Sequence, residues 1–148
     1  MPDDIKFAPS VGDAHFRKYG KTFQEKIFQG LLTDHDWGSQ MIEVMDPTFF
    51  DVRYLSYLSE KYFNYFKKYK CFPTLPLLVS IIKDDLSEGN DIILRDQIVE
   101  FLHRVKSNPN MGDINYVKDK SLDFCKRQAF KEALESAVDL IQTDKFES

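Results

Sequence analysis

The sequence predicts an all-α protein in which a compact helical bundle is followed by a long antiparallel helical hairpin. Apolar residues recur at spacings of three and four over most of the chain, which is the period of an amphipathic helix. The alternation of apolar and polar residues that a half-buried strand requires persists nowhere. We expect three regions: a flexible N-terminal arm over 1–21, a globular helical subdomain over 22–91, and a helical hairpin over 92–148 that leads towards a linker.

The composition is typical of a folded, soluble domain. The chain has 148 residues, of which 43% are hydrophobic and 30% charged, enough to bury a core. Its net charge of −4 argues against a dedicated nucleic-acid clamp, which is usually basic. No apolar run approaches the roughly 18 residues of a membrane span, and Asp3 and Asp4 stand where a targeting peptide needs basic residues. Cys71 and Cys125 lack CxxC spacing, so we expect reduced thiols, a cytoplasmic protein and no membrane partner.

Three signals predict the first part of the bundle. Apolar residues at helical spacing indicate a helix over 22–32. The polar run 33–36 ends this helix and supplies capping side chains for a short helix that stops before Pro47. Phe49 and Phe50 follow in a turn, and we expect both rings to fill the core.

A long helix is predicted over 51–70, and a shorter one follows it over 75–86. Phe72-Pro73-Thr74 ends the long helix, and Thr74 suits the N-cap of the next one. Pro76 is tolerated there because first-turn N–H groups have no partner inside a helix. A polar loop over 87–91 leads to the hairpin. One continuous apolar stripe runs along the long helix, and we expect most of its rings to lie in the core: Leu55, Leu58, Tyr62, Tyr65, Phe66 and Tyr69.

The hairpin is predicted from two amphipathic stretches separated by a polar turn over 107–113. Folded back on itself, it would set Phe101 beside Ser121, a large residue facing a small one. The flanking pairs would be Val105 with Val117 and Ile98 with Phe124. A two-helix hairpin cannot bury both of its sides, so its outer faces need a partner. The residues expected to pack the hairpin or form a dimer interface are Leu94, Ile98, Phe101, Leu102, Val105, Val117, Leu122 and Phe124.

The second arm of the hairpin changes its apolar direction near Gln128. At about 100° per residue, the earlier stripe and the later one are centred about a third of a turn apart. We therefore expect the helix to change packing partners partway along. The later stripe consists of Phe130, Leu134, Ala137, Val138 and Ile141.

Two short motifs resemble chemical sites and are better explained as structure. Gly20-Lys21-Thr22 could close a phosphate-binding loop, but that loop needs a glycine where this chain has His15, and a preceding strand. Asp34-His35-Asp36 could ligate a metal, but adjacent ligands seldom converge and no other cluster completes the set. A capped helix junction is the simpler interpretation. We expect no catalytic site, cofactor or metal in this segment.

Residues 54–72 interleave aromatic side chains with lysines, a composition with which proteins hold single-stranded nucleic acid. Most of these rings share one helix face and are expected in the core. The outward apolar positions Val99, Leu102, Met111 and Leu122 are expected to have no partner within one copy. The candidate contacts with a partner are Tyr57, Lys61, Phe63, Lys68, Val99 and Met111.

The order of these features over about 22–146 resembles the N-terminal domain of DnaB-type replicative DNA helicases. The resemblance is carried by Ile27-Phe28-Gln29-Gly30-Leu31-Leu32, Asp34, Trp37, Val44, Phe49-Phe50, Phe72-Pro73-Thr74-Leu75, Ser107-Asn108-Pro109, Tyr116-Val117 and Phe124-Cys125-Lys126-Arg127-Gln128-Ala129.

The resemblance implies a collar that assembles as a trimer of dimers through the hairpins, above six RecA-like motor domains. The implied partners are further copies of the chain, primase and a helicase loader, with DNA bound mainly through the motor. The motor that uses ATP and magnesium is absent here, so we expect no enzymatic activity from this segment. The implied location is the cytoplasm of a bacterial cell or of a phage-infected host. Two alternatives stay open: the helicase-binding domain of a primase, or a small single-stranded-DNA-binding or loader-like protein.

Overall fold

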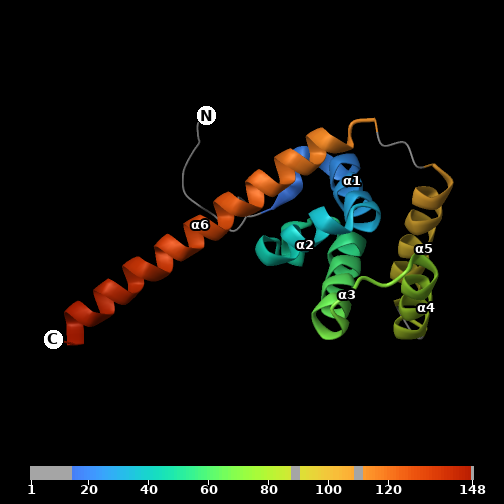
Figure 1. Ribbon diagram of the computed structural model, residues 1–148. Helices are drawn as coiled ribbons and strands as arrows, with labels where there is room; N and C mark the ends of the chain where they lie inside the picture. Colours follow the sequence, from blue (N-terminus) through green and yellow to red (C-terminus); the bar gives the residue numbers. More distant parts are fainter. Residues whose placement is uncertain (1–14, 88–90, 109–111, 148) are drawn as a thin grey trace.

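The computed structural model describes residues 15–87, 91–108 and 112–147, with the side chains of the last helix described up to residue 143. Over these residues it is helical throughout, with no strand, which confirms the all-α prediction (Figure 1). The elements are η3 (Phe16–Tyr19), α1 (Gly20–Thr33), α2 (His35–Val44), η4 (Pro47–Phe49), α3 (Arg53–Tyr69), α4 (Leu75–Asp85), α5 (Ile92–Ser107) and α6 (Ile114–Glu147).

The predicted helix starts are formed by side-chain caps. The Asp34 carboxylate accepts a hydrogen bond from the backbone N–H of Trp37 at 3.1 Å and so caps α2. The Thr74 hydroxyl accepts one from the N–H of Leu77 at 3.4 Å and caps α4. Each cap satisfies a first-turn donor that has no partner inside its own helix. Both predicted caps are confirmed.

The core is built largely from aromatic rings, and one of them belongs to the segment expected to be a flexible arm. Phe16 on η3 is fully buried, with its ring centre 5.9 Å from that of Phe49, 5.3 Å from Phe50 and 5.1 Å from Phe124. Burial of Phe49 and Phe50 confirms that they fill the core. The arm prediction is wrong for residues 15–21, because a buried aromatic ring anchors them, and residues 1–14 lie outside the described part of the chain.

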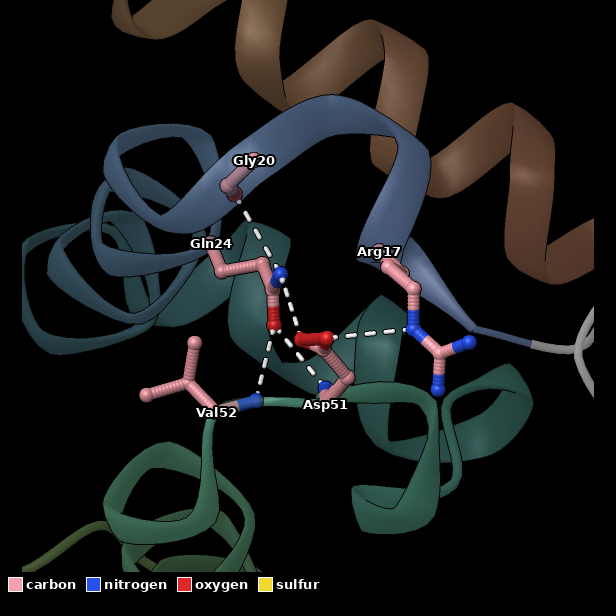
Figure 2. A network of polar contacts seen from close by, with 5 residues as sticks. All are labelled: Arg17, Gly20, Gln24, Asp51 and Val52. Carbon is pink, nitrogen blue, oxygen red and sulfur yellow. Dashed lines mark hydrogen bonds and ion pairs between the residues drawn. The ribbon is translucent and has the colours of Figure 1, made fainter.

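A buried glutamine fastens the start of α1 to the segment that enters α3 (Figure 2). The Gln24 carbonyl oxygen accepts hydrogen bonds from the backbone N–H groups of Asp51 at 3.0 Å and Val52 at 3.4 Å. Its amide nitrogen donates to the Gly20 carbonyl and to the Asp51 carboxylate, each at 3.2 Å. Arg17 donates to the same carboxylate at 3.2 Å. Gln24 is thus buried at little cost, because its polar atoms find partners.

The hairpin prediction is correct for the two helices and wrong for their pairing. Among the described elements, α5 packs against α4 and α3, whereas α6 packs against α1 and α2. In Figure 1, α6 runs from the top of α1 away from the α4–α5 pair. Helical spacing determines which residues share a face of one helix. It does not determine which neighbouring helix covers that face.

The three expected hairpin contacts are replaced by contacts with the bundle. The Phe101 ring lies 6.2 Å from the Phe28 ring and 5.9 Å from the Tyr54 ring, not beside Ser121. The Phe124 ring lies 5.6 Å from that of Phe49, not beside Ile98. The helices of the predicted hairpin are therefore part of the bundle itself, up to the point where α6 leaves it. Val117 on α6 is buried in the core, and Val105 on α5 is half-buried against the same core.

Candidate functional site

The residues predicted to form a hairpin or dimer interface lie mostly inside one copy of the chain. Leu102 was expected to face outward, but it is 0% exposed because α4 packs over α5. Val105 and Leu122 are half-buried against the core. Six residues of the set are buried and pack the core of the chain itself: Leu94, Ile98, Phe101, Leu102, Val117 and Phe124.

Two of the predicted partner contacts are already used within the chain, and a third is in the core. Phe63 is only 2% exposed, so its prediction as a partner contact is wrong. The Tyr57 hydroxyl donates to the Asp85 carboxylate, and Lys61 pairs with the same carboxylate at 3.1 Å. These contacts join α3 to the end of α4.

The other predicted partner contacts lie at the surface or outside the description. Lys68 is exposed, with its Nζ 5.3 Å from the centre of the Tyr69 ring. Val99 is half-buried on α5. Met111 lies outside the described residues. Among the described residues, these predicted contacts do not form one common surface.

An exposed apolar surface lies on the part of α6 that leaves the bundle. The C-terminal part of α6, drawn in red in Figure 1, extends away from the other helices. Phe130, Leu134, Val138, Leu140 and Ile141 are 50–67% exposed there. The sequence predicts that the apolar stripe of α6 changes direction near Gln128. The earlier stripe, with Val117 and Phe124, is buried in the core, whereas the later stripe is exposed. We name the later surface the distal α6 face: Phe130, Leu134, Ala137, Val138, Leu140 and Ile141.

The distal α6 face occupies about half of the helix circumference. At about 100° per residue, its six members fall within one half-turn of arc. The other half carries Lys131, Glu132, Glu135, Ser136 and Asp139. A contiguous exposed apolar patch bordered by polar residues is typical of an interaction site. The segment is therefore an amphipathic helix whose large apolar side chains are at least half exposed.

A second apolar surface lies between α4 and α5, at the opposite side of the molecule. A groove of about 400 Å³ is lined by Leu75, Pro76, Val79, Leu102, His103 and Lys106. A hollow of about 330 Å³ adjoins it, shares Leu75 and Lys106, and reaches Leu32 at the end of α1. We name the two together the α4–α5 groove. Sequence reasoning missed it, although Leu75 and Val79 lie one helical turn apart on α4.

A network of charged and phenolic groups fastens α1 to α3 and α5 beside these surfaces. Arg104 donates to both Glu25 carboxylate oxygens, at 3.1 and 2.9 Å. Tyr54 donates its hydroxyl to the same carboxylate. Burial would raise the pKa of Glu25, but the hydrogen bonds from Arg104 and Tyr54 outweigh it and lower that pKa. Burial and the Glu25 carboxylate together raise the pKa of Tyr54.

The residues considered for a metal site serve a structural junction. The Asp34 carboxylate caps α2 and also accepts a hydrogen bond from the Lys118 ammonium at 2.7 Å. These bonds lower the pKa of Asp34. Within the described part of the chain, no three His, Cys, Asp or Glu side chains lie close enough together to hold a metal ion.

Neither the described helices nor the comparisons with known proteins assign this chain to a protein family. No helix in the described ranges has both the length and the apolar content that crossing a membrane requires. Comparison with protein-family models, with curated proteins and with solved structures finds no match.

Proposed function

We propose that this chain is an oligomerisation and partner-binding domain, namely the N-terminal collar domain of a DnaB-type replicative DNA helicase. The observation that carries the proposal is the distal α6 face. It is an apolar surface on a helix that extends away from its own bundle. Its partners would be other copies of the chain, with primase or a loader binding to the assembled collar.

The energetics of the distal α6 face favour a partner. Fully burying one large apolar side chain contributes about 1.5–3 kcal/mol. Five such side chains are at least half exposed on this segment. An isolated helix of about 12–15 residues is also only marginally stable in water. Contact with another chain would bury the apolar side chains and hold the helix together.

The residues of the family resemblance support the proposal because they occupy framework positions of one bundle. Phe49 and Phe50 form a buried step directly before the long helix α3. Thr74 caps α4 after the Pro73 turn. The resemblance implies assembly through the helical hairpins. The structure does not pair α5 with α6, so we assign that role to the distal α6 face.

The primase alternative differs in its partner and not in its fold class. A helicase-binding domain would use the same face for a helicase ring and would not need to self-associate. The single-stranded-DNA alternative relied on Tyr57 and the lysine face. It is less well supported, because Tyr57 and Lys61 are both engaged by Asp85. Salt-dependent affinity for single-stranded DNA would favour it.

The test is the mass of the protein in solution, measured by light scattering at several concentrations. We expect the wild-type chain to associate as concentration rises. The variant L134D I141D places two charges on the distal α6 face and should stay monomeric. The matched control S136D Q142D adds the same charges on the polar side of the helix and should associate like the wild type.

The proposal has a clear failing outcome. A wild-type chain that stays monomeric at every concentration would contradict self-association and would leave the primase alternative. Equal loss of association in both double variants would mean that net charge, and not the apolar face, is responsible. Helicity measured by circular dichroism should be unchanged in both variants, because all four positions are exposed.

A further inference from the structure

We infer that residues 1–14 of the chain lie along the distal α6 face of the same copy and compete with a second copy for it. The inference rests on the proposed self-association and adds the contact that regulates it. The occupant is thus a segment of this chain that lies outside the described residues, and we call it the N-terminal segment.

The described chain begins against α6, close to the start of the distal α6 face. The Phe16 ring centre lies 5.1 Å from that of Phe124, and the first described residues, in dark blue, lie beside α6 in Figure 1. The backbone at His15 is extended. Phe130 follows Phe124 by about 9 Å along the helix axis. The N-terminal segment is therefore joined to the bundle next to the uncovered apolar surface.

The length of the N-terminal segment matches the length of the face. An extended chain spans about 3.3 Å per residue, whereas an α-helix rises about 1.5 Å per residue. Val11 and Phe7 can therefore reach about 17 Å and about 30 Å from the start of η3. Leu134 and Ile141 lie about 15 Å and about 26 Å beyond Phe124 along α6. Two large apolar side chains of the segment would thus come level with two of the face.

The composition of the N-terminal segment favours an extended strap with one apolar side. Its large apolar residues Ile5, Phe7 and Val11 occupy odd-numbered positions, which an extended chain points to the same side. Two prolines and Gly12 interrupt the segment and disfavour a helix. An extended strap of this kind could lay its apolar side along the distal α6 face.

The charges of the two partners are opposite where they would meet. Three basic side chains border the face where it begins: Lys126, Arg127 and Lys131. By helical spacing they lie within about 90° of the centre of the face, whereas the acidic side chains between 132 and 139 lie on the opposite side. Arg127 pairs with Asp123 at 2.7 Å, which leaves the two lysines without an ion pair among the described residues. The segment itself is acidic, with the charged residues Asp3, Asp4, Lys6 and Asp13. Opposite charges beside an apolar contact orient the two partners.

A tethered segment has an advantage over a free partner in dilute protein. A short tether presents the segment to its site at an effective concentration on the order of millimolar. The N-terminal segment should therefore cover the face at low protein concentration, and a second copy should displace it as the concentration rises. The measured affinity of self-association is then reduced by the fraction of chains whose face is free.

A disulfide test in the full chain locates the N-terminal segment. In a Cys71→Ser background, Ser10→Cys is combined with Ala137→Cys on the face or with Ser136→Cys on the polar side. Ala137 and Ser136 are neighbouring exposed positions, and Cys125 is buried. Ser10 and Ala137 would come level, each about 20 Å from the contact between η3 and α6.

The rates of disulfide formation are measured in oxidised glutathione at a concentration where the protein is monomeric. We expect the intramolecular disulfide to position 137 to form at least about tenfold faster than that to position 136, because the effective concentration of the segment is higher at the face. Equal rates overturn the inference, whether or not the wild-type chain self-associates.

An association test separates the N-terminal segment from the face that it covers. I5D F7D should release the face and lower the dissociation constant of self-association at least about tenfold, the factor for a face that is free in one chain of ten. The control A8D S10D adds the same charges on the other side of the extended segment and should associate like the wild type. An unchanged dissociation constant in I5D F7D overturns the competition. A wild-type chain that stays monomeric at every concentration contradicts the proposed self-association, and the disulfide rates then still decide whether the segment lies on the face.

Discussion

Lys118 on α6 donates a hydrogen bond to the carboxylate of Asp34, the residue that caps α2, at 2.7 Å. The Asp34 carboxylate therefore caps α2 and forms an ion pair with α6 at the same time. Lys118 also lies 5.9 Å from the centre of the Trp37 ring. This contact fastens the base of α6 to the bundle and sets the direction in which its distal part extends.

The two roles of Asp34 can be separated by substitution. Asp34→Ala removes both the cap and the ion pair, and should lower the free energy of unfolding by about 1–2 kcal/mol. Asp34→Asn keeps an acceptor for the N–H of Trp37 and should cost less, because only the partly exposed ion pair is lost. Urea denaturation measures both. Equal losses would show that the cap contributes nothing.

The stability of the protein should fall in acid because three carboxyl groups, those of Glu25, Asp34 and Asp113, have lowered pKa values in the folded state. The Asp34 and Glu25 pKa values are both below their ordinary values. Their contribution is present above the unfolded pKa values of about 4 and is lost as the pH falls through the lower folded values. The urea midpoint should therefore decrease below about pH 4. Glu25→Gln should flatten this dependence, and an unchanged profile would contradict the assignment.

Phe101 and Phe130 provide a matched test of core against surface. Phe101 is buried against Phe28 and Tyr54, so Phe101→Ala should cost about 3–5 kcal/mol of unfolding free energy. Phe130 is 66% exposed, and Phe130→Ala should leave the unfolding free energy of the monomer nearly unchanged. Measurement at low concentration keeps association out of the comparison. A large loss for Phe130→Ala would show that it is packed within its own chain.

The two cysteine thiols should react at very different rates. Cys71 is exposed, whereas Cys125 is fully buried and burial raises its pKa to about 12. The thiolate is the reactive species, so native protein should titrate one fast thiol per chain with a disulfide reagent. Unfolded protein should titrate two. Cys71→Ser should remove the fast phase, and a fast phase that persists would place Cys125 within reach of solvent.

A larger residue at Gly30 should destabilise the protein while Trp37 is present. A Cβ built at Gly30 lies 3.1 Å from Cζ3 of the Trp37 ring. Gly30→Val should therefore cost about 1–3 kcal/mol through overpacking. The same substitution in a Trp37→Leu background should cost less, because the ring that it meets is gone. Additive losses in this double-mutant cycle would contradict direct contact between the two positions.

The sequence alone determined the helices and their ends. Asp34, Thr74 and the Pro47 turn are local signals, since caps and helix breakers act within a few residues of themselves. The change in direction of the apolar stripe of α6 near Gln128 was also predictable, because helical spacing shows which residues share a face. All of these features depend on short-range chemistry that one stretch of sequence contains.

Only the tertiary structure decided which helix covers which face. The stripe with Val117 and Phe124 is equally apolar whether α5 or the α1–α2 pair lies against it, and the structure selects α1 and α2. From the sequence, Phe16 is predicted to lie in a flexible arm, whereas in the structure its ring packs against those of Phe49, Phe50 and Phe124. Leu102 is predicted from the sequence to face outward, whereas in the structure α4 covers it. Helical periodicity shows which residues share a face of one helix. Burial depends on contacts between segments that are distant in sequence, and no such contact covers the distal α6 face among the described residues.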